Sequence, residues 1–371
     1  MKKIINIIFL LIITINSYSQ DNLFSQSDLD MLFMNPAYAG YHGMDGKATN
    51  RILIHDREQW LKINGRPFNT SYAEASFNIG SSRKSLLGSR STFAIGGYLM
   101  SDWQDIIFQT DEIGISLSGI SQVNKYFIHQ LGLGFSLKHG KINNNGLIFG
   151  DQLNYYNNNV AALDPQNLPL TTNYTSYPNP GAGYIAGFRI NRRIQRWTTI
   201  GFSGMNLFRN ANKKSFNNTE YNVNPPRYYT FINHNEPIKL ETTISSIKSV
   251  NIFARHMRQI ERLDRIEAGI TLEFKTDNWE IIPGLVYRRS DAFDNRYMQE
   301  SLIGIIRYKF RFKNLKQNNW KMSINYSYDF NRSELTHISS GSTHEMGIAL
   351  HLFTRNKSIC AGVCPVEEHI W

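Results

Sequence analysis

The chain has 371 residues, carries a formal net charge of +10 at pH 7 and has a sequence pI of about 9.4. Its mean hydropathy of −0.37 argues against a bundle of membrane-spanning helices, and its 2 cysteines are too few for a disulfide-held scaffold. Lys and Arg are spread along the chain rather than gathered in one patch, so we expect no nucleic-acid partner.

Residues 1–20 have the three parts of a secretory signal peptide. Lys2 and Lys3 give a positive start, residues 4–15 are almost continuously apolar, and residues 16–20 are short and polar. The pattern predicts export, with cleavage near Ser19 or Gln20. The apolar run is too short for a helix that crosses the membrane, which needs about 20 apolar residues. The alternative to a signal peptide is a buried N-terminal helix. No later segment reaches that length, so an exported chain would be either soluble or a β-barrel.

Residues 21–45 lack strand alternation and carry two short motifs. These are Phe24-Ser25-Gln26 and Asn35-Pro36-Ala37-Tyr38-Ala39-Gly40. The second motif is typical of a turn, because Asn caps, Pro fixes φ and Gly tolerates a positive φ. Between the motifs, residues 28–33 can form one short helical turn. We expect this segment to enter a barrel from the periplasmic side and to help fill its lumen.

Period-2 alternation dominates the rest of the chain. Between residues 320 and 331, even-numbered positions are apolar or aromatic and odd-numbered positions are polar or charged. We expect strands at residues 47–59, 67–79, 91–101, 107–120, 126–139, 183–191, 196–205, 227–234, 248–256, 263–274, 278–289, 300–312, 319–330 and 342–353. A soluble β-sandwich also alternates, but many of these strands approach the roughly 9–11 residues of a tilted transmembrane strand. The prediction is an all-β fold, a transmembrane antiparallel β-barrel of about 14 strands within residues 46–353.

Two long connections, residues 142–182 and 206–226, fall on the same side of such a barrel. With both chain ends in the periplasm, that side is extracellular, and the opposite turns are mostly short, as in outer-membrane barrels. Both connections are rich in Asn, Tyr, Thr and Pro, and Tyr supplies rigid contact area with a polar tip. The candidate partner-binding residues are Tyr155, Tyr156, Tyr174, Tyr177 and Tyr221. Porin loops can have the same composition, so composition alone does not decide their role.

No motif for catalysis, cofactor binding or metal binding stands out in the chain. His55 with Asp56, and His344 with Glu345, are adjacent pairs, but neighbours on a strand point to opposite faces, so neither pair forms a dyad.

Residues 354–371 form an expected C-terminal periplasmic tail. It contains Cys360 and Cys364, for which a disulfide, free thiols or a thin metal site with His369 all stay open.

The order of the motifs resembles the PorP/SprF family of Bacteroidetes outer-membrane proteins. That order is a leader, Phe24-Ser25-Gln26, the Asn35–Gly40 motif, then Arg57, Gln59 and Trp60 on a first strand, and β-hairpins to the end. The family is tied to type IX secretion and gliding motility. The resemblance implies a barrel without a cofactor that holds a secreted protein, bearing a type IX C-terminal domain, at the cell surface, or that pairs with a periplasmic peptidoglycan-binding lipoprotein. The added Cys360 and the long tail depart from the family pattern.

Three functions are compatible with these patterns. The first is a non-enzymatic outer-membrane component of type IX secretion or gliding. The second is a porin or a barrel similar to fatty-acid transporters, which moves small molecules through an open lumen. The third is a soluble secreted β-rich enzyme, which membrane fractionation would distinguish from both barrels.

Overall fold

The protein is described from a computed structural model, which describes residues 24–26, 29–40, 49–59, 68–84, 90–104, 108–124, 126–142, 153–154, 159–160, 173–174, 178–191, 196–207, 213–216, 219–222, 226–241, 246–259, 263–276, 279–292, 298–313, 319–331 and 342–353. The helical elements are α2 (Met31–Met34) and η1 (Pro36–Tyr38). The long strands are β1 (Thr49–Gln59), β2 (Phe68–Lys84), β3 (Arg90–Gln104), β4 (Phe108–Gln122), β5 (Phe127–Ile142), β9 (Pro178–Asn191), β10 (Arg196–Met205), β13 (Arg227–Glu241), β14 (Ser246–Gln259), β15 (Leu263–Lys275), β16 (Trp279–Ala292), β17 (Met298–Lys313), β18 (Asn319–Asn331) and β19 (Thr343–Phe353). The short strands are β6 (Leu153–Asn154), β7 (Asn159–Val160), β8 (Asn173–Tyr174), β11 (Lys213–Phe216) and β12 (Thr219–Asn222). In the described part of the chain, no helix has the length and apolar character that a membrane span requires.

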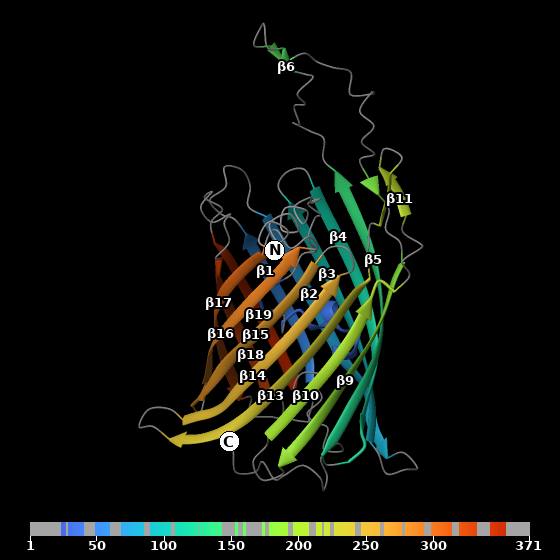
Figure 1. Ribbon diagram of the computed structural model, residues 1–371. Helices are drawn as coiled ribbons and strands as arrows, with labels where there is room; N and C mark the ends of the chain where they lie inside the picture. Colours follow the sequence, from blue (N-terminus) through green and yellow to red (C-terminus); the bar gives the residue numbers. More distant parts are fainter. Residues whose placement is uncertain are drawn as a thin grey trace, which may run out of the picture.

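The 14 long strands close into one antiparallel barrel (Figure 1). Each pairs with its neighbour among the long strands, and the ring closes where β1 pairs with β19, from Thr49 opposite Phe353 to Gln59 opposite Thr343. Closure leaves no free sheet edge, which a strand-built membrane protein requires because lipid cannot bond to the backbone. The predicted all-β barrel of 14 strands is confirmed.

Some strand boundaries differ from the expected ones for identifiable reasons. β9 begins at Pro178 rather than at residue 183, because its start is rich in Pro, Asn and Gly and resembles a turn in sequence. β13 continues to Glu241 rather than ending at residue 234, and its pairing with β14 shifts register between Pro237 and Leu240. The short strands β6, β7, β8, β11 and β12 lie in stretches that we expected to be loops.

Alternating side chains sort cleanly between the lumen and the outer surface of the barrel. On β1, Leu53 and His55 point inward and are fully buried, while Ile52 and Ile54 point outward and are 40% and 65% exposed. Apolar side chains therefore cover the surface that faces lipid, and polar ones face the lumen, as in outer-membrane barrels. Trp103 and Trp320 are exposed on the outside near strand ends, where such barrels carry aromatic girdles.

The two ends of the barrel differ in their connections. The two long connections, from β5 to β9 and from β10 to β13, join strands at the end where β1 finishes, and we call this the long-loop end. The opposite end, where β1 begins, has only the brief connections between β2 and β3, β4 and β5, β9 and β10, β13 and β14, β15 and β16, and β17 and β18. We call it the short-turn end. Labels β6 and β11 mark the long-loop end at the top of Figure 1.

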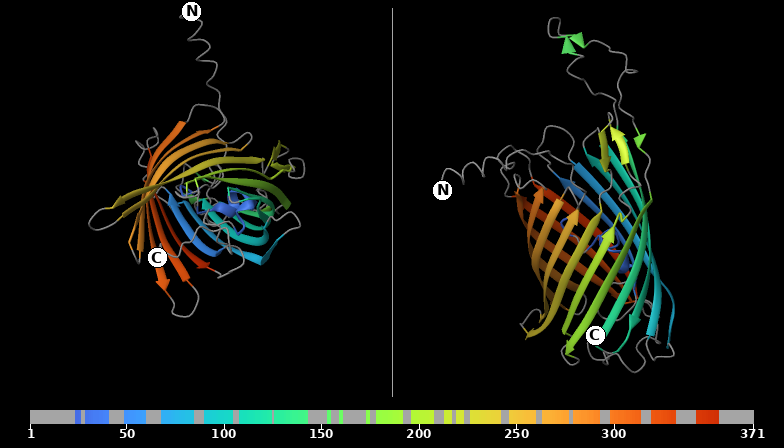
Figure 2. Two further views of the ribbon diagram at one scale, coloured as in Figure 1. Left: turned by 90° about the horizontal axis from the view of Figure 1, so that it is seen from below. Right: turned by 45° about the vertical axis from the view of Figure 1, so that its right-hand side comes forward.

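The described residues of 24–40 lie inside the barrel, and we call them the lumen segment (Figure 2, left). The segment begins near the long-loop end, where Ser25 contacts the start of β19, and finishes near the short-turn end, where Ala39 contacts the start of β5. It contains α2 and η1, so a short helical turn is present, but at Met31–Met34 rather than at the expected residues 28–33. An N-terminal segment that enters the lumen was predicted, and the structure confirms it.

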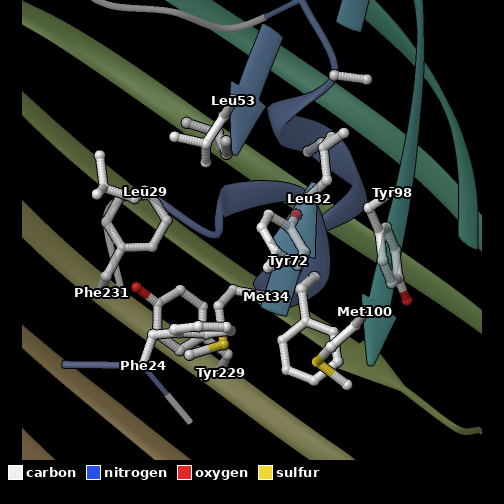
Figure 3. Packing of buried hydrophobic residues seen from close by; sticks show 14 of the residues in the cluster. Phe24, Leu29, Leu32, Met34, Leu53, Tyr72, Tyr98, Met100, Tyr229 and Phe231 are labelled. Atoms are coloured by element: carbon white, nitrogen blue, oxygen red, sulfur yellow. The ribbon is translucent and has the colours of Figure 1, made fainter. Parts of the chain in front are cut away.

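The lumen segment gives the barrel an apolar core. Its side chains pack with inward-facing side chains of the wall in one cluster (Figure 3), which comprises Phe24, Leu29, Leu32, Phe33, Met34, Ala37, Ala39, Leu53, Tyr72, Ala94, Tyr98, Met100, Ile185, Tyr229, Phe231, Met257 and Ala349. All are buried, and each large side chain taken out of water contributes about 1.5–3 kcal/mol. The lumen is thus packed like a protein interior along the length of the segment.

Candidate functional site

At the long-loop end, one carboxylate holds two consecutive backbone N–H groups of the lumen segment. The N–H of Ser25 donates to Glu345 Oε1 at 2.5 Å, and the N–H of Gln26 donates to Glu345 Oε2 at 3.0 Å. All three residues are buried. Hydrogen bonds to a charged acceptor are about twice as strong as neutral ones. Glu345 is therefore the anchor for this end of the segment.

Two side chains of β1 position the anchor. Arg57 Nε lies 3.2 Å from Glu345 Oε1, and His55 Nε2 lies 3.6 Å from Glu345 Oε2. On its other side, His55 Nδ1 lies 2.8 Å from Asp30 Oδ1, so the ring joins β19 to the lumen segment. Burial raises the pKa of Asp30 to about 6, and the attraction of His55 opposes that rise. The first and last strands of the barrel are thus linked through the segment.

A second ion pair adds to the hold on Ser25. Arg288 Nη2 lies 2.5 Å from Asp329 Oδ2. The Ser25 hydroxyl donates to Asp329 Oδ2 at 2.5 Å and accepts from Arg288 Nη1 at 2.8 Å. The pairing and the added hydrogen bonds from Ser25 offset part of the cost of removing these charges from water.

A third group of charges holds the carbonyl of Phe24. Arg265 Nη2 donates to that oxygen at 2.8 Å. The Arg265 guanidinium is itself paired with Glu267, whose other carboxylate oxygen lies 3.7 Å from Arg255 Nη1. The Phe24 ring stacks on His55 with centroids 4.5 Å apart. Backbone and side chain of Phe24 are therefore fixed by different strands.

Arginines also hold the middle of the lumen segment through its carbonyl oxygens. Arg51 Nη2 donates to the Leu29 carbonyl at 2.7 Å, and Arg51 Nη1 lies 3.1 Å from Glu74 Oε1. Arg227 Nη2 donates to the Phe33 carbonyl at 2.7 Å, and its guanidinium carbon lies 3.9 Å from the centroid of the Phe33 ring. The cation–π contact adds to the hydrogen bond.

The Asn-Pro-Ala motif forms a self-capped turn that also bonds to the wall. Asn35 Oδ1 accepts the N–H of Ala37 at 2.9 Å, and Pro36 occupies the first position of η1, where its missing N–H is not needed. Asn35 Nδ2 donates to the Phe202 carbonyl of β10 at 3.2 Å. The Asn35 side chain thus stabilises the turn and also bonds it to the barrel wall.

Two wall glycines make room for this turn. A Cβ added to Gly132 would lie 2.2 Å from the Ala37 nitrogen, and one added to Gly183 would lie 1.9 Å from Asn35 Oδ1. Both distances are too short for any side chain, so the turn sits directly against the backbone of β5 and β9. We call this contact the glycine socket, defined by Gly132 and Gly183.

The segment leaves the lumen near the short-turn end at Ala39 and Gly40. The Ala39 carbonyl accepts from Ser118 Oγ at 2.6 Å and from Gln130 Nε2 at 2.7 Å. Gly40 has a φ of +71°, and a Cβ there would lie 2.4 Å from the Cβ of Ala94. Glycine is required at this position both for the left-handed backbone and for the close approach.

The structure gathers most of the motif residues at this site. Phe24–Gln26 and Asn35–Gly40 lie in the lumen, and Arg57 lies beside the anchor. Gln59 is the last residue of β1 and is half-buried, and Trp60 lies outside the described residues. Ser25, Gln26 and Arg57 therefore meet at Glu345, whereas Asn35–Ala39 contacts other strands, β4, β5, β9 and β10.

The predicted partner-binding and disulfide residues are not gathered. Tyr174 lies on β8, opposite Gly140 of β5, and Tyr221 lies on β12, opposite Lys214. Tyr155, Tyr156, Tyr177, Cys360 and Cys364 lie outside the described residues. Among the residues that are described, His, Cys, Asp and Glu form no group of three that could hold a metal ion.

Sequence reasoning missed the anchor. It treated His55 with Asp56, and His344 with Glu345, as neighbours that point apart, which is correct, because Asp56 accepts from Ser71 outside the lumen at 2.6 Å. It did not pair His55 with Glu345 across the two strands. The sequence could have indicated this pair, because a closed barrel requires its first and last strands to pair. The inward-facing His55 and Glu345 can then face each other.

Comparison with known families decides what kind of barrel this is. A family model described as "Type IX secretion system membrane protein PorP/SprF" matches residues 16–350. The chain belongs to the PorP/SprF family. This PorP/SprF protein is therefore a membrane protein associated with type IX secretion, and its barrel places it in the outer membrane. No curated protein matches the chain.

Solved structures share only the general barrel with this PorP/SprF protein. A Pseudomonas aeruginosa FadL homologue is 10% identical with a TM-score of 0.48, over 86% of this chain and 92% of its own. The CymD monoaromatic hydrocarbon channel is 12% identical with a TM-score of 0.46, over 90% of this chain and 94% of its own. Likenesses this weak say nothing about what this PorP/SprF barrel binds or moves.

Proposed function

We propose that this PorP/SprF protein is a non-enzymatic outer-membrane anchor for an exported protein in the type IX pathway. The cleaved leader delivers it to the envelope, the long-loop end faces the cell exterior, and the short-turn end faces the periplasm, as in barrels with short periplasmic turns. The barrel provides the membrane attachment, and its two ends provide the contacts. Its function then depends on surfaces rather than on a reaction or a pore.

The observation that supports this proposal is the packed lumen. The lumen segment is bonded to Glu345 at one end and to Ser118 and Gln130 at the other, and its apolar side chains are buried between. A porin needs a water-filled interior, whereas a barrel that only anchors and presents loops does not. The segment therefore favours anchoring over small-molecule transport, which is the alternative function for the same fold.

The proposed exterior contact is made by residues 143–177 and 206–226. Their tyrosines, Tyr155, Tyr156, Tyr174, Tyr177 and Tyr221, supply rigid, amphipathic contact area for the C-terminal domain of a secreted protein. The proposed periplasmic contact is a peptidoglycan-binding lipoprotein at the short turns, several of which contain Arg or Lys. Such a pair of contacts would tie a surface protein through the barrel to the cell wall.

Two measurements test the proposal. In planar bilayers, the purified protein should show no large steady conductance, because the lumen segment fills the passage. In cells, deleting residues 155–177, which end before β9 begins, should leave a folded, heat-modifiable barrel but release the exported protein into the medium. A large steady pore in the intact protein would support the transport alternative, and retention of the exported protein after the deletion would place the attachment elsewhere.

A further inference from the structure

The barrel wall binds the main chain of the lumen segment as well as its apolar side chains. The carbonyl oxygens of Phe24, Leu29, Phe33, Met34 and Ala39 accept hydrogen bonds from wall side chains. The N–H groups of Ser25 and Gln26 donate to Glu345, and that of Leu32 lies 3.4 Å from Glu74 Oε2. These bonds define the backbone path, and the apolar cluster adds a requirement for the side chains along it.

The wall groups that make these bonds are held in place by other wall groups. Glu345 is positioned by Arg57 and His55. Arg265 is paired with Glu267, which belongs to the same strand. Glu345, Arg265 and Arg51 thus each have a partner that does not belong to the segment. A set of donors and acceptors fixed before the ligand arrives is the arrangement expected of a binding site, because little ordering is left to be done on binding.

The shape of the wall matches the segment as well. The glycine socket accepts the Asn35–Ala37 turn at distances that no side chain would allow. A turn of small residues therefore docks at the socket, while the anchor at Glu345 receives an extended backbone. The two contacts define the ends of one continuous site.

Side chains of the segment are matched less completely than its backbone. Gln26 is fully buried, yet its amide nitrogen and oxygen have no hydrogen-bond partner among the described residues. Burying an amide without partners opposes docking. The site therefore does not depend on this side chain, and a simple apolar replacement should bind better.

We propose that the lumen is a peptide-binding site whose resident ligand is the chain's own residues 24–40, and that it accepts the same segment as a separate peptide. The ligand class is a polypeptide with an extended stretch at the Glu345 anchor and an Asn-Pro-Ala turn at the glycine socket. This site goes beyond the anchoring function proposed above. The proposal depends only on the contacts between the barrel wall and the lumen segment. A barrel in a secretion pathway would thereby be able to bind a stretch of polypeptide when its own segment is withdrawn.

The test uses a synthetic peptide of residues 21–40 with a fluorescent label. The barrel of residues 41–371 is refolded in detergent, and uptake of the peptide is measured by fluorescence anisotropy. In parallel, the full chain with a protease site placed within residues 41–48 is folded first and then cut, so that the resident segment is free to exchange. The cut form decides the result if the shortened chain does not fold.

Saturable binding is expected, and a peptide with residues 35–37 in scrambled order should not bind. Gly132→Ala in the barrel should weaken binding about tenfold or more, because its new Cβ would occupy the socket. Gly304→Ala is the matched control and should leave binding unchanged, because a Cβ there meets nothing within 4 Å. A Gln26→Leu peptide should bind more tightly than the natural one.

The proposal is overturned if a folded 41–371 barrel does not take up the peptide, or if it binds the scrambled peptide equally well. It is also overturned if the cut form keeps its own segment against excess labelled peptide until the barrel unfolds. Binding is read by anisotropy rather than by conductance or by retention of an exported protein. A failure here is therefore distinguishable from a failure of the anchoring function.

Discussion

Replacing Glu345 with Gln should release the long-loop end of the lumen segment. The change keeps the side-chain volume but removes the charge that binds the N–H groups of Ser25 and Gln26 and faces Arg57. A Gln amide has a single acceptor oxygen, so one N–H group meets an NH2 group instead. Losing these charge-assisted hydrogen bonds should weaken docking of the segment by about 1.5–3 kcal/mol.

This cost should fall on the docked segment rather than on the barrel. The backbone of Glu345 pairs with Arg57 of β1 and Ser327 of β18, and the substitution leaves both ladders intact. At about 1.4 kcal/mol for each tenfold change, a loss of about 1.5–3 kcal/mol raises the detached fraction of the segment by on the order of 10- to 100-fold. The barrel itself should remain heat-modifiable on gels.

Thiol labelling measures the detached fraction directly. Gln26 is fully buried, so a Gln26→Cys chain, with Cys360 and Cys364 changed to Ser, should react slowly with a maleimide. Adding Glu345→Gln should increase the labelling rate by on the order of 10- to 100-fold. The matched control is Glu300→Gln, because Glu300 accepts from Tyr287 on the outside of the barrel. A folded Glu345→Gln barrel that labels as slowly as the control would refute the anchor.

Three further predictions concern other contacts of the segment. Gly132→Ala should destabilise docking by about 1–3 kcal/mol through overpacking, whereas Gly304→Ala should change it by less than about 0.5 kcal/mol; denaturant titration of segment protection compares the two. Asn35→Ala removes the acceptor for Ala37 and should cost about 0.5–2 kcal/mol in the same assay. Burial raises the pKa of Asp30 to about 6, so its contribution to docking is fully present below its ordinary value and is lost as pH rises through about 6. The thiolate is the reacting form, so each labelling rate is divided by that of a free Gln26→Cys peptide of residues 21–40 at the same pH. This ratio should be lower at pH 5 than at pH 7 by on the order of tenfold, and Asp30→Asn should abolish the difference.

The barrel could be predicted from the sequence because polar and apolar side chains alternate along each strand. In β18, Ser323, Asn325, Ser327 and Asp329 face the lumen and are buried, while Phe330 faces outward, as the alternation indicated. Lipid on one side and a packed lumen on the other impose this period on every strand. Boundaries were less predictable at β9, where Pro178 and its neighbours resemble a turn but continue a ladder.

The anchor could not be predicted from local pattern, because its members are far apart in sequence. Ser25 and Glu345 are 320 residues apart, and the bond requires both closure of β1 onto β19 and entry of the segment. Alternation identifies Glu345 as inward-facing but not its partner. The glycine socket could not be predicted either, because glycines such as Gly132 and Gly183 also occur in strands with ordinary packing or at a bulge.

The remaining question is whether the lumen segment docks as one unit. Phe24 at one end and Ala37 and Ala39 near the other belong to a single buried cluster, so no break separates the anchor from the socket. If docking is cooperative, Gly132→Ala should raise labelling at Gln26 as well, although the two sites do not touch, and its effect should add to that of Glu345→Gln in free energy. If the ends detach independently, Gly132→Ala will leave labelling at Gln26 unchanged. That second outcome would contradict the continuous site, and it would mean that the segment opens at the anchor while the turn stays in its socket.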